Sequence, residues 1–142
     1  MVVVYADDEH TARQQVSRAL RLRGHTVITL DTGSAMQLEE QVARLLSSVR
    51  ENGLVIDVLV LDGHNYLLDE NGHLLADMTP RSFLEWLWQN KLCRECHYIL
   101  YTNDSGMVAE AQLQKSIRFA ATICKVGVGG GLQALLESLE HL

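Results

Sequence analysis

The chain has 142 residues, of which 47% are hydrophobic, and this length suits one domain, residues 1–142, with a single hydrophobic core. The formal net charge of −6 argues against direct nucleic-acid binding, and no apolar run has the form of a signal peptide or reaches the roughly 18 residues of a membrane span. The odd number of cysteines, three, fits a reducing compartment better than a disulfide framework, so we predict a cytoplasmic protein.

Short apolar runs alternate with helical patterns five times along the chain. The predicted strands cover residues 2–6, 26–30, 58–61, 97–101 and 120–124. Apolar residues at helical spacing follow each strand, over residues 12–20, 38–49, 83–87, 105–117 and 132–139. Gly24 and Gly53 mark the predicted ends of the first two helices, and Pro80 suits the first turn of the third. A turn at 127–131 precedes the last helix. This alternation predicts an α/β fold with a doubly wound, five-stranded parallel sheet.

The central predicted strand, residues 58–61, is apolar throughout and is followed by Asp62. An unbroken apolar run indicates a strand that is buried on both faces. Polar groups also follow three other strands: Asp7 and Asp8 the first, Thr102 the fourth and Lys125 the fifth. Because ligands bind at the C-terminal ends of parallel strands, we predict that three carboxylates, a hydroxyl and an ammonium converge on one crevice.

These groups have the chemistry that phosphoryl transfer to a carboxylate requires. Three clustered carboxylates raise one another's pKa unless a hard divalent cation with oxygen ligands, such as Mg²⁺, neutralises them. An ammonium and a hydroxyl stabilise the charge that spreads over the phosphoryl oxygens. Asp62 is the candidate nucleophile, with Lys125 as the fixed cation and Thr102 as the donor.

The order of these signals resembles that of the response-regulator receiver domains over nearly the whole chain. The resemblance implies a flavodoxin-like receiver fold with strand order 2-1-3-4-5. It further implies that Asp62 is the phosphoacceptor, that Asp7, Asp8, Asp62 and the backbone carbonyl of His64 hold Mg²⁺, and that Thr102 and Lys125 contact the phosphoryl oxygens.

The same resemblance implies a role in two-component phosphorelay signalling. A histidine kinase or a phosphotransfer protein would supply the phosphoryl group, and a separate output protein would receive the signal. The chain would then be a phosphoprotein that assists its own phosphorylation and dephosphorylation, and not an enzyme acting on an external substrate.

Three positions depart from the family pattern. Val126 stands where the family usually has proline after the lysine, Thr122 replaces the usual aromatic switch residue, and Asn103 is larger than the small residue commonly found after the threonine. Thr122, Val126 and an enlarged loop after the third strand favour an alternative, a pseudo-receiver that binds its partner without phosphorylation. An aspartyl-phosphate phosphohydrolase is a third hypothesis, against which the missing D-x-D start argues.

The largest departure is an enlarged loop after the third strand, residues 63–79. Asn71-Gly72 lies between two apolar runs, which predicts a β-hairpin in which both residues tolerate positive φ. We expect this hairpin near the mouth of the crevice. Its leucines are predicted either to pack on the domain or to form an interaction surface, namely Leu67, Leu68, Leu74 and Leu75.

Cys93 and Cys96, followed by His97, form a C-x-x-C-H pattern before the fourth strand. This pattern occurs in haem attachment, which requires export, and in zinc sites, which need a further ligand pair that the sequence lacks. We therefore predict reduced cysteines at these positions.

Overall fold

The computed structural model describes residues 1–113, 117–125 and 128–142. The departure at Val126, the 114–116 part of the fourth predicted helix and the first residue of the 127–131 turn lie outside the described residues. Among the described residues, no helix is both long enough and apolar enough to cross a membrane.

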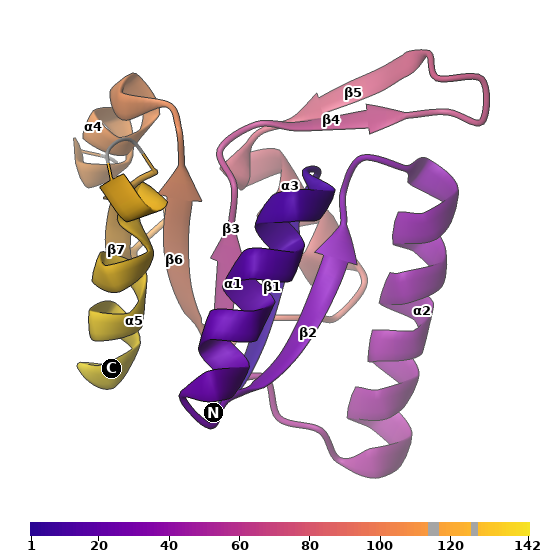
Figure 1. Cartoon of the computed structure of the whole chain (residues 1–142). Helices are drawn as coiled ribbons and strands as arrows, with labels where there is room; N and C mark the ends of the chain where they lie inside the picture. The colour runs from indigo at the N-terminus through magenta and orange to yellow at the C-terminus, as the bar shows by residue number, and fades with distance from the viewer. Residues whose placement is uncertain (114–116, 126–127) are drawn as a thin grey trace.

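A five-stranded parallel sheet forms the centre of the molecule, with the strand order β2-β1-β3-β6-β7 (Figure 1). Its strands are β1 (Val2–Asp7), β2 (Thr26–Asp31), β3 (Val58–Leu61), β6 (His97–Thr102) and β7 (Phe119–Cys124). The helices are α1 (His10–Leu22), α2 (Ala35–Asn52), α3 (Pro80–Gln89), α4 (Ser105–Leu113) and α5 (Leu132–Glu140), with a 3₁₀ turn, η1, at Val128–Gly131. Because β6 and β7 are the fourth and fifth strands of this sheet, the predicted order 2-1-3-4-5 is confirmed.

Helices cover both faces of the sheet and bury two hydrophobic clusters. Side chains alternate along a strand, so β1 sends Val4 and Ala6 to one face and Val3 and Tyr5 to the other. Residues of α2 and α3 pack on the first face, and residues of α1 and α5 pack on the second (Figure 1). The two central strands, β1 and β3, are therefore buried on both sides, which explains their unbroken apolar sequences.

Local signals fix the helix ends where the sequence predicted them. Gly24 and Gly53 take φ angles of +85° and +66°, the left-handed conformation that favours glycine after a helix. Thr79 caps α3 by accepting a hydrogen bond from the Ser82 N–H at 3.4 Å, and Pro80 occupies the first helical position.

The enlarged loop forms the predicted hairpin, with β4 (Asn65–Leu68) antiparallel to β5 (Leu74–Met78). Its turn differs from the predicted one: within residues 69–73, all of which the structure describes, Gly72 alone takes a positive φ, +78°. The Gly72 N–H donates to the Asp69 carbonyl at 3.1 Å, and the Asp69 N–H donates to the His73 carbonyl at 2.9 Å. Asn71 needs no positive φ because the connection has three residues instead of two.

Hydrogen bonds dock this hairpin across the C-terminal edge of the sheet, from where it extends over the start of α2 (Figure 1). Asn65 is fully buried; its Oδ1 accepts from the Thr32 hydroxyl at 2.5 Å, and its Nδ2 donates to the Asp62 carbonyl at 3.1 Å. Leu67 packs against the hydrophobic cluster below, whereas Leu74 and Leu75 remain 60% and 57% exposed. The hairpin therefore has an anchored face and an apolar face open to solvent.

Candidate functional site

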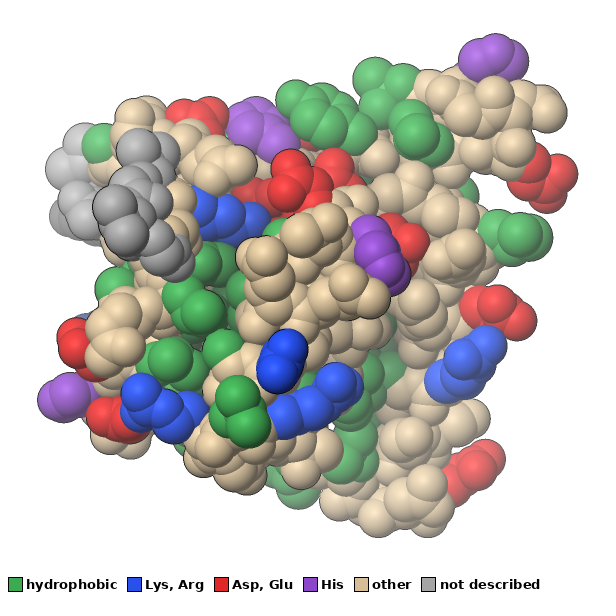
Figure 2. All heavy atoms as spheres, viewed as in Figure 1, with side chains coloured by type: hydrophobic (Ala, Val, Ile, Leu, Met, Phe, Trp, Pro, Cys, Tyr) green, Lys and Arg blue, Asp and Glu red, His purple; other side chains and the backbone are tan. Residues whose placement is uncertain are grey.

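Three carboxylates meet at the C-terminal edge of the sheet. Asp7 ends β1 and Asp62 follows β3, and the register pairs Ala6 with Leu61, so the two acids lie at the same level of neighbouring strands. One oxygen from each of Asp7, Asp8 and Asp62 lies within 4.8 Å of the others. In Figure 2 acidic side chains gather at this edge beneath the hairpin. The structure thus brings together the carboxylates that the sequence placed at strand ends.

Lys125 completes the cluster from the end of β7. Its Nζ lies 2.7 Å from Asp7 Oδ2 and 3.5 Å from Asp62 Oδ2, and it sits 5.0 Å from the centroid of the Tyr101 ring. Burial acts to lower the pKa of Lys125, but Asp7 and Asp62 outweigh it and raise the pKa, so the ammonium stays charged. The Lys125 N–H also donates to the Thr102 carbonyl at 2.8 Å. These contacts hold the lysine without a proline after it.

Asp7 is fully buried and its oxygens are occupied by fixed donors. The Tyr5 hydroxyl donates to Oδ2 at 2.5 Å, and the Glu9 N–H donates to Oδ1 at 2.9 Å. Burial and the neighbouring Asp7 raise the pKa of Tyr5, which therefore remains a proton donor. Sequence reasoning missed Tyr5 because it treated the residue as part of an apolar strand. The available signal was its spacing, since residues i and i+2 of a strand share a face.

Asp62 has a side chain that is 12% exposed, so it is less deeply buried than the fully buried Asp7. Its Oδ1 accepts a hydrogen bond from the Gly63 N–H at 2.7 Å, and Thr102 lines the same cavity as Asp62. Burial raises the pKa of Asp62, Lys125 lowers it, and Asp7 raises it, with a net upward shift. The carboxylate is therefore held in an environment that favours added positive charge.

Gly63 is required by the close approach of α4 and β6. A Cβ at this position would lie 2.3 Å from Met107 Sδ and 2.6 Å from Thr102 Oγ1. Thr102 is almost completely buried, and its Oγ1 accepts the Asp104 N–H at 3.2 Å. The glycine thus allows the threonine hydroxyl to approach the nucleophile.

Asp8 is the most open of the three acids. Its Oδ2 accepts the Tyr66 N–H from the hairpin at 3.3 Å. Burial raises the pKa of Asp8, the Tyr66 hydrogen bond lowers it, and Asp7 and Asp62 raise it, with a net upward shift. Unlike the other two acids, Asp8 has no ammonium within ion-pair distance among the described residues.

His64 bridges the mouth of the pocket. Its Nε2 lies 3.0 Å from Asp104 Oδ2 in the β6–α4 loop, and its Nδ1 lies 3.3 Å from Asp77 Oδ2 in β5. The imidazole stacks on Tyr66 at 6.2 Å between ring centroids. The hydrogen bond that His64 makes to the Asp104 carboxylate raises the pKa of His64, burial opposes the shift, and Asp77 adds to it. The side chain therefore joins the hairpin to the loop, and the predicted role of its backbone carbonyl stays a prediction.

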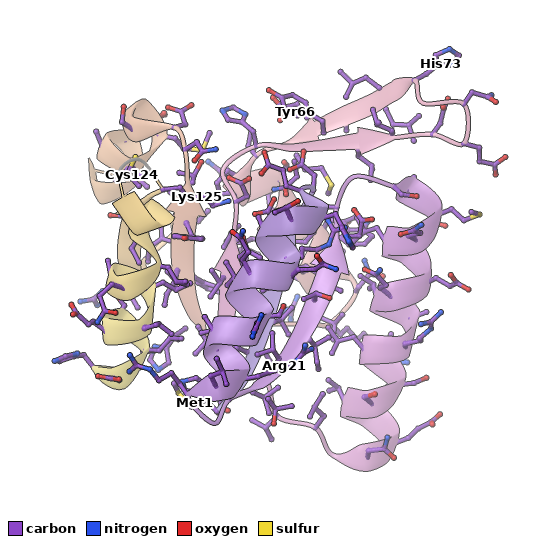
Figure 3. The ribbon with its side chains drawn as sticks, in the orientation of Figure 1. Met1, Arg21, Tyr66, His73, Cys124 and Lys125 are labelled. Carbon is purple, nitrogen blue, oxygen red and sulfur yellow. The ribbon has the colours of Figure 1, made fainter. Side chains whose placement is uncertain are left out.

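A cavity opens at this position, lined by Asp8, Glu9, Asp62, His64, Tyr66, Thr102, Asn103 and Asp104. Figure 3 shows Tyr66 and Lys125 at the same end of the molecule, with His73 at the far tip of the hairpin. Asn103 lines the cavity without closing it. Four of the sequence-predicted site residues, Asp8, Asp62, His64 and Thr102, thus line this opening, and the hairpin contributes Tyr66 to its wall; Asp7 and Lys125 are not among the lining residues.

The donor set fits a hard divalent cation. Among the residues that the structure describes, Lys125 is the only ammonium in ion-pair contact with the three aspartates, so the ionised cluster keeps an excess of negative charge. Carboxylate oxygens are the ligands that Mg²⁺ prefers, and a cation removes the repulsion that raises the carboxylate pKa values. Among the described residues these aspartates are the only group of three or more such ligands. The ligand atoms of Cys93, Cys96 and His97 do not form such a group in this structure, and both cysteines are free of disulfides.

No protein-family model matches the sequence, and no curated protein matches it. The fold is similar to that of the chemotaxis protein CheY4 of Vibrio cholerae, with a TM-score of 0.64 and 18% identity over 99% of this chain and 96% of that one. A response regulator receiver protein from Pseudomonas putida matches with a TM-score of 0.63 and 14% identity, covering 99% and 96%. The N-terminal domain of a response regulator/sensory box/GGDEF 3-domain protein from Carboxydothermus hydrogenoformans matches with a TM-score of 0.61 and 16% identity, over 99% of this chain and 92% of that one. The chain therefore has the receiver-domain fold that its motifs resemble.

Proposed function

We propose that this chain is a receiver domain that accepts a phosphoryl group on Asp62 and signals through protein contacts. A histidine kinase or phosphotransfer protein supplies the group, and the protein works in the cytoplasm. One observation carries the proposal: the Asp62 carboxylate lies beside the ammonium of Lys125, the hydroxyl of Thr102 and an acidic pair, in a pocket open to solvent. These groups supply a nucleophile and its electrostatic support without an external catalytic base.

In the proposed reaction an oxygen of Asp62 donates an electron pair to the phosphorus atom. The bond from phosphorus to the donor's leaving atom breaks, that atom keeps the bonding pair, and an acyl phosphate forms. Lys125 and Thr102 then lie where they stabilise the charge on the phosphoryl oxygens. Mg²⁺, held by Asp7, Asp8, Asp62 and the His64 carbonyl, would neutralise charge on the carboxylates and the incoming phosphoryl group.

Asp7 positions Lys125 in this scheme. The short Nζ–Oδ2 contact of 2.7 Å, together with the Tyr101 ring, fixes the ammonium between Asp7 and Asp62. Tyr5 in turn orients the Asp7 carboxylate. The protein therefore acts on its own phosphorylation and is not proposed to turn over an external substrate.

A pseudo-receiver is the second candidate, and the mouth of the pocket favours it. His64 spans from the hairpin to the β6–α4 loop across the opening, and the lining is otherwise rich in carboxylates. Both features oppose the entry of an anionic phosphodonor. In that case the fold would bind its partner without chemistry at Asp62.

Intact-mass measurement after incubation with Mg²⁺ and phosphoramidate or acetyl phosphate tests the proposal. We expect a mass gain of one phosphoryl group in the parent and none in Asp62→Asn. Asp57→Asn is the matched control, because Asp57 lies beside the same strand at its opposite end and accepts the Val2 N–H, which an asparagine oxygen can also do. Absence of any adduct in the parent, with Mg²⁺ binding retained, would support the pseudo-receiver. Continuous release of phosphate from an ester would instead support a phosphohydrolase.

A further inference from the structure

Two cysteines lie together in the loop between α3 and β6, away from the acidic pocket. β6 runs from His97 to Thr102, so a loop that ends at Cys96 is at the opposite edge of the sheet from Asp62. The Cys96 thiol donates a hydrogen bond to the Cys93 carbonyl oxygen at 3.5 Å, so the two residues are in direct contact. This contact is unrelated to phosphorylation and is unexplained by the proposed function.

The backbone already holds the pair in a geometry that a disulfide can use. Residues 94 and 95 form a turn between the two cysteines. The ends of a β-turn have Cα atoms within about 7 Å, and disulfides join Cα atoms about 4.4–6.8 Å apart. The Tyr98 hydroxyl donates to the Cys93 carbonyl, which fixes one end of the turn. Bond formation therefore needs little movement of the chain.

Cys93 itself carries local strain. Its φ is +56°, a left-handed conformation that costs a residue other than glycine roughly 1–3 kcal/mol. The strain is not required to end α3, because Lys91 already takes the left-handed conformation there, at φ +60°. A strained cysteine next to a second thiol is the kind of outlier that accompanies reactive sites.

The two thiols differ in the way that an attacking and a resolving cysteine differ. Cys96 is partly exposed, whereas Cys93 is 7% exposed and packs in the core. The hydrogen bond from Cys93 holds the pKa of Cys96 below its usual value despite burial, and the same bond together with burial raises the pKa of Cys93. Thiolates are the attacking species in disulfide exchange, so Cys96 attacks first.

A cationic cavity opens beside Cys96. It is lined by Trp88, Arg94, Cys96, His97, Tyr98, Ile117, Arg118, Phe119 and Ala120. Arg94 and Arg118 are both exposed, and no acidic side chain is among the described lining residues. A small molecule bearing carboxylates would therefore find two guanidinium groups near the sulfur, in a protein whose net charge is negative.

We propose that Cys93 and Cys96 form a redox site that exchanges with a low-molecular-weight anionic disulfide. The Cys96 thiolate attacks one sulfur of the disulfide, forms a mixed disulfide and releases the other half as a thiolate. Cys93 loses its proton to solvent, and its thiolate attacks the Cys96 sulfur and releases the second half. Two cysteine thiols are thereby oxidised to one intramolecular disulfide, and the small disulfide is reduced to two thiols.

The test uses the reduced full chain with glutathione disulfide under native conditions. After acid quenching, denaturation and alkylation with iodoacetamide, peptide mass spectrometry locates the modified cysteines. We expect a chain two hydrogens lighter, with Cys93 joined to Cys96 and with Cys124 alkylated. In Cys93→Ser the mixed disulfide on Cys96 should accumulate, because no resolving thiol is present. In Cys96→Ser the reaction at Cys93 should be slower by at least about tenfold, since that thiol is buried and protonated.

Two further measurements separate a site from incidental oxidation. In the double variant Arg94→Gln, Arg118→Gln, exchange with glutathione disulfide should slow by roughly two- to tenfold, while exchange with neutral 2-hydroxyethyl disulfide stays unchanged. If the double variant exchanges with glutathione disulfide as fast as the parent does, relative to the neutral probe, the proposed recognition of the anion is overturned. Alkylation of Cys93 and Cys96 to the same extent as Cys124, or a stable glutathione adduct on the parent, would overturn the redox site itself.

Discussion

Asp8→Asn should raise the stability of the metal-free protein and remove its response to Mg²⁺. Asp8 has two carboxylates within 4.8 Å and lacks the direct ion pair to Lys125 that Asp7 and Asp62 make. The asparagine keeps an oxygen that can accept the Tyr66 N–H, so the substitution removes charge and leaves the hairpin contact in place. Any change in the free energy of unfolding therefore reports the repulsion between Asp8 and the other two carboxylates.

The size of the expected stability gain follows from Coulomb's law. One pair of unit charges 4.8 Å apart repels by about 1 kcal/mol in water and about 3.5 kcal/mol at an effective dielectric constant of 20. Lys125 offsets roughly one of the two repulsions, and Asp8 is only about half buried, so a net gain of about 1–2 kcal/mol is expected on removing the charge. For a domain of this size that gain corresponds to a melting temperature about 4–8 °C higher.

Thermal unfolding with and without Mg²⁺ checks this expectation. At a Mg²⁺ concentration ten times its Kd the parent should gain about 1.4 kcal/mol, whereas Asp8→Asn should gain little. The two stability curves therefore approach each other as Mg²⁺ rises. Glu95→Gln removes one exposed charge at the opposite edge of the sheet and should leave the Mg²⁺ response unchanged. A variant that is less stable than the parent without metal, with the same Mg²⁺ gain, would refute the reasoning.

Four other expectations concern the glycine, the histidine bridge, the hairpin and the missing aromatic. Gly63→Ala places a Cβ 2.3 Å from a methionine sulfur, so urea unfolding should show a loss of about 1–3 kcal/mol and phosphorylation should slow; an unchanged midpoint would contradict the close packing. The pKa of His64 is raised in the folded state, so its contribution to stability is complete below pH about 6.5 and is lost as pH rises through the folded pKa. His64→Gln should flatten that part of the stability–pH profile, and a profile identical to that of the parent would argue against the bridge. Trimming residues 67–76 to a short linker should preserve the fold but weaken partner binding or change the phosphorylation rate. The double variant Leu74→Ser, Leu75→Ser changes exposed positions of the same hairpin, so it should shift the free energy of unfolding by less than about 0.5 kcal/mol. With Thr122 in place of an aromatic, amide exchange in the described parts of α4 and β7 should change little when a phosphoryl mimic and Mg²⁺ are added, and large changes there would show that coupling uses this strand after all.

The sheet and the acidic site were predictable because their signals are local. An apolar run such as Val58–Leu61 reports burial on both faces, and the residue after it marks the edge where parallel strands present their ends. Asp7, Asp62 and Lys125 meet because the strand order brings those ends together. The alternation of strands and helices predicted a parallel sheet, and the resemblance to receiver domains implied the order of its strands.

The contacts that orient the site join residues far apart in the chain and carry no local signal. His64 pairs with Asp104, 40 positions later, and Thr32 bonds Asn65, 33 positions later. Each side chain alone is typical of a polar loop residue, and its partner is defined only after the hairpin has docked. The turn was missed for a different reason, because the Asp69 side chain accepts from two backbone N–H groups and thereby favours a three-residue connection.

The hairpin and the acidic cluster depend on each other. Asn65 at the base of β4 donates to the carbonyl of Asp62, and the Tyr66 N–H donates to Asp8, so the docked hairpin is bonded to two of the three acids. A change of charge at Asp8 alters the strength of the bond from the Tyr66 N–H, because hydrogen bonds to charged acceptors are the stronger ones, whereas the Asn65 bond goes to the backbone carbonyl of Asp62. The exposed apolar face of β5 lies on the same rigid hairpin. Under the proposed function, the hairpin is therefore an element in direct contact with the site through which phosphorylation of Asp62 would reach a partner without the usual aromatic residue.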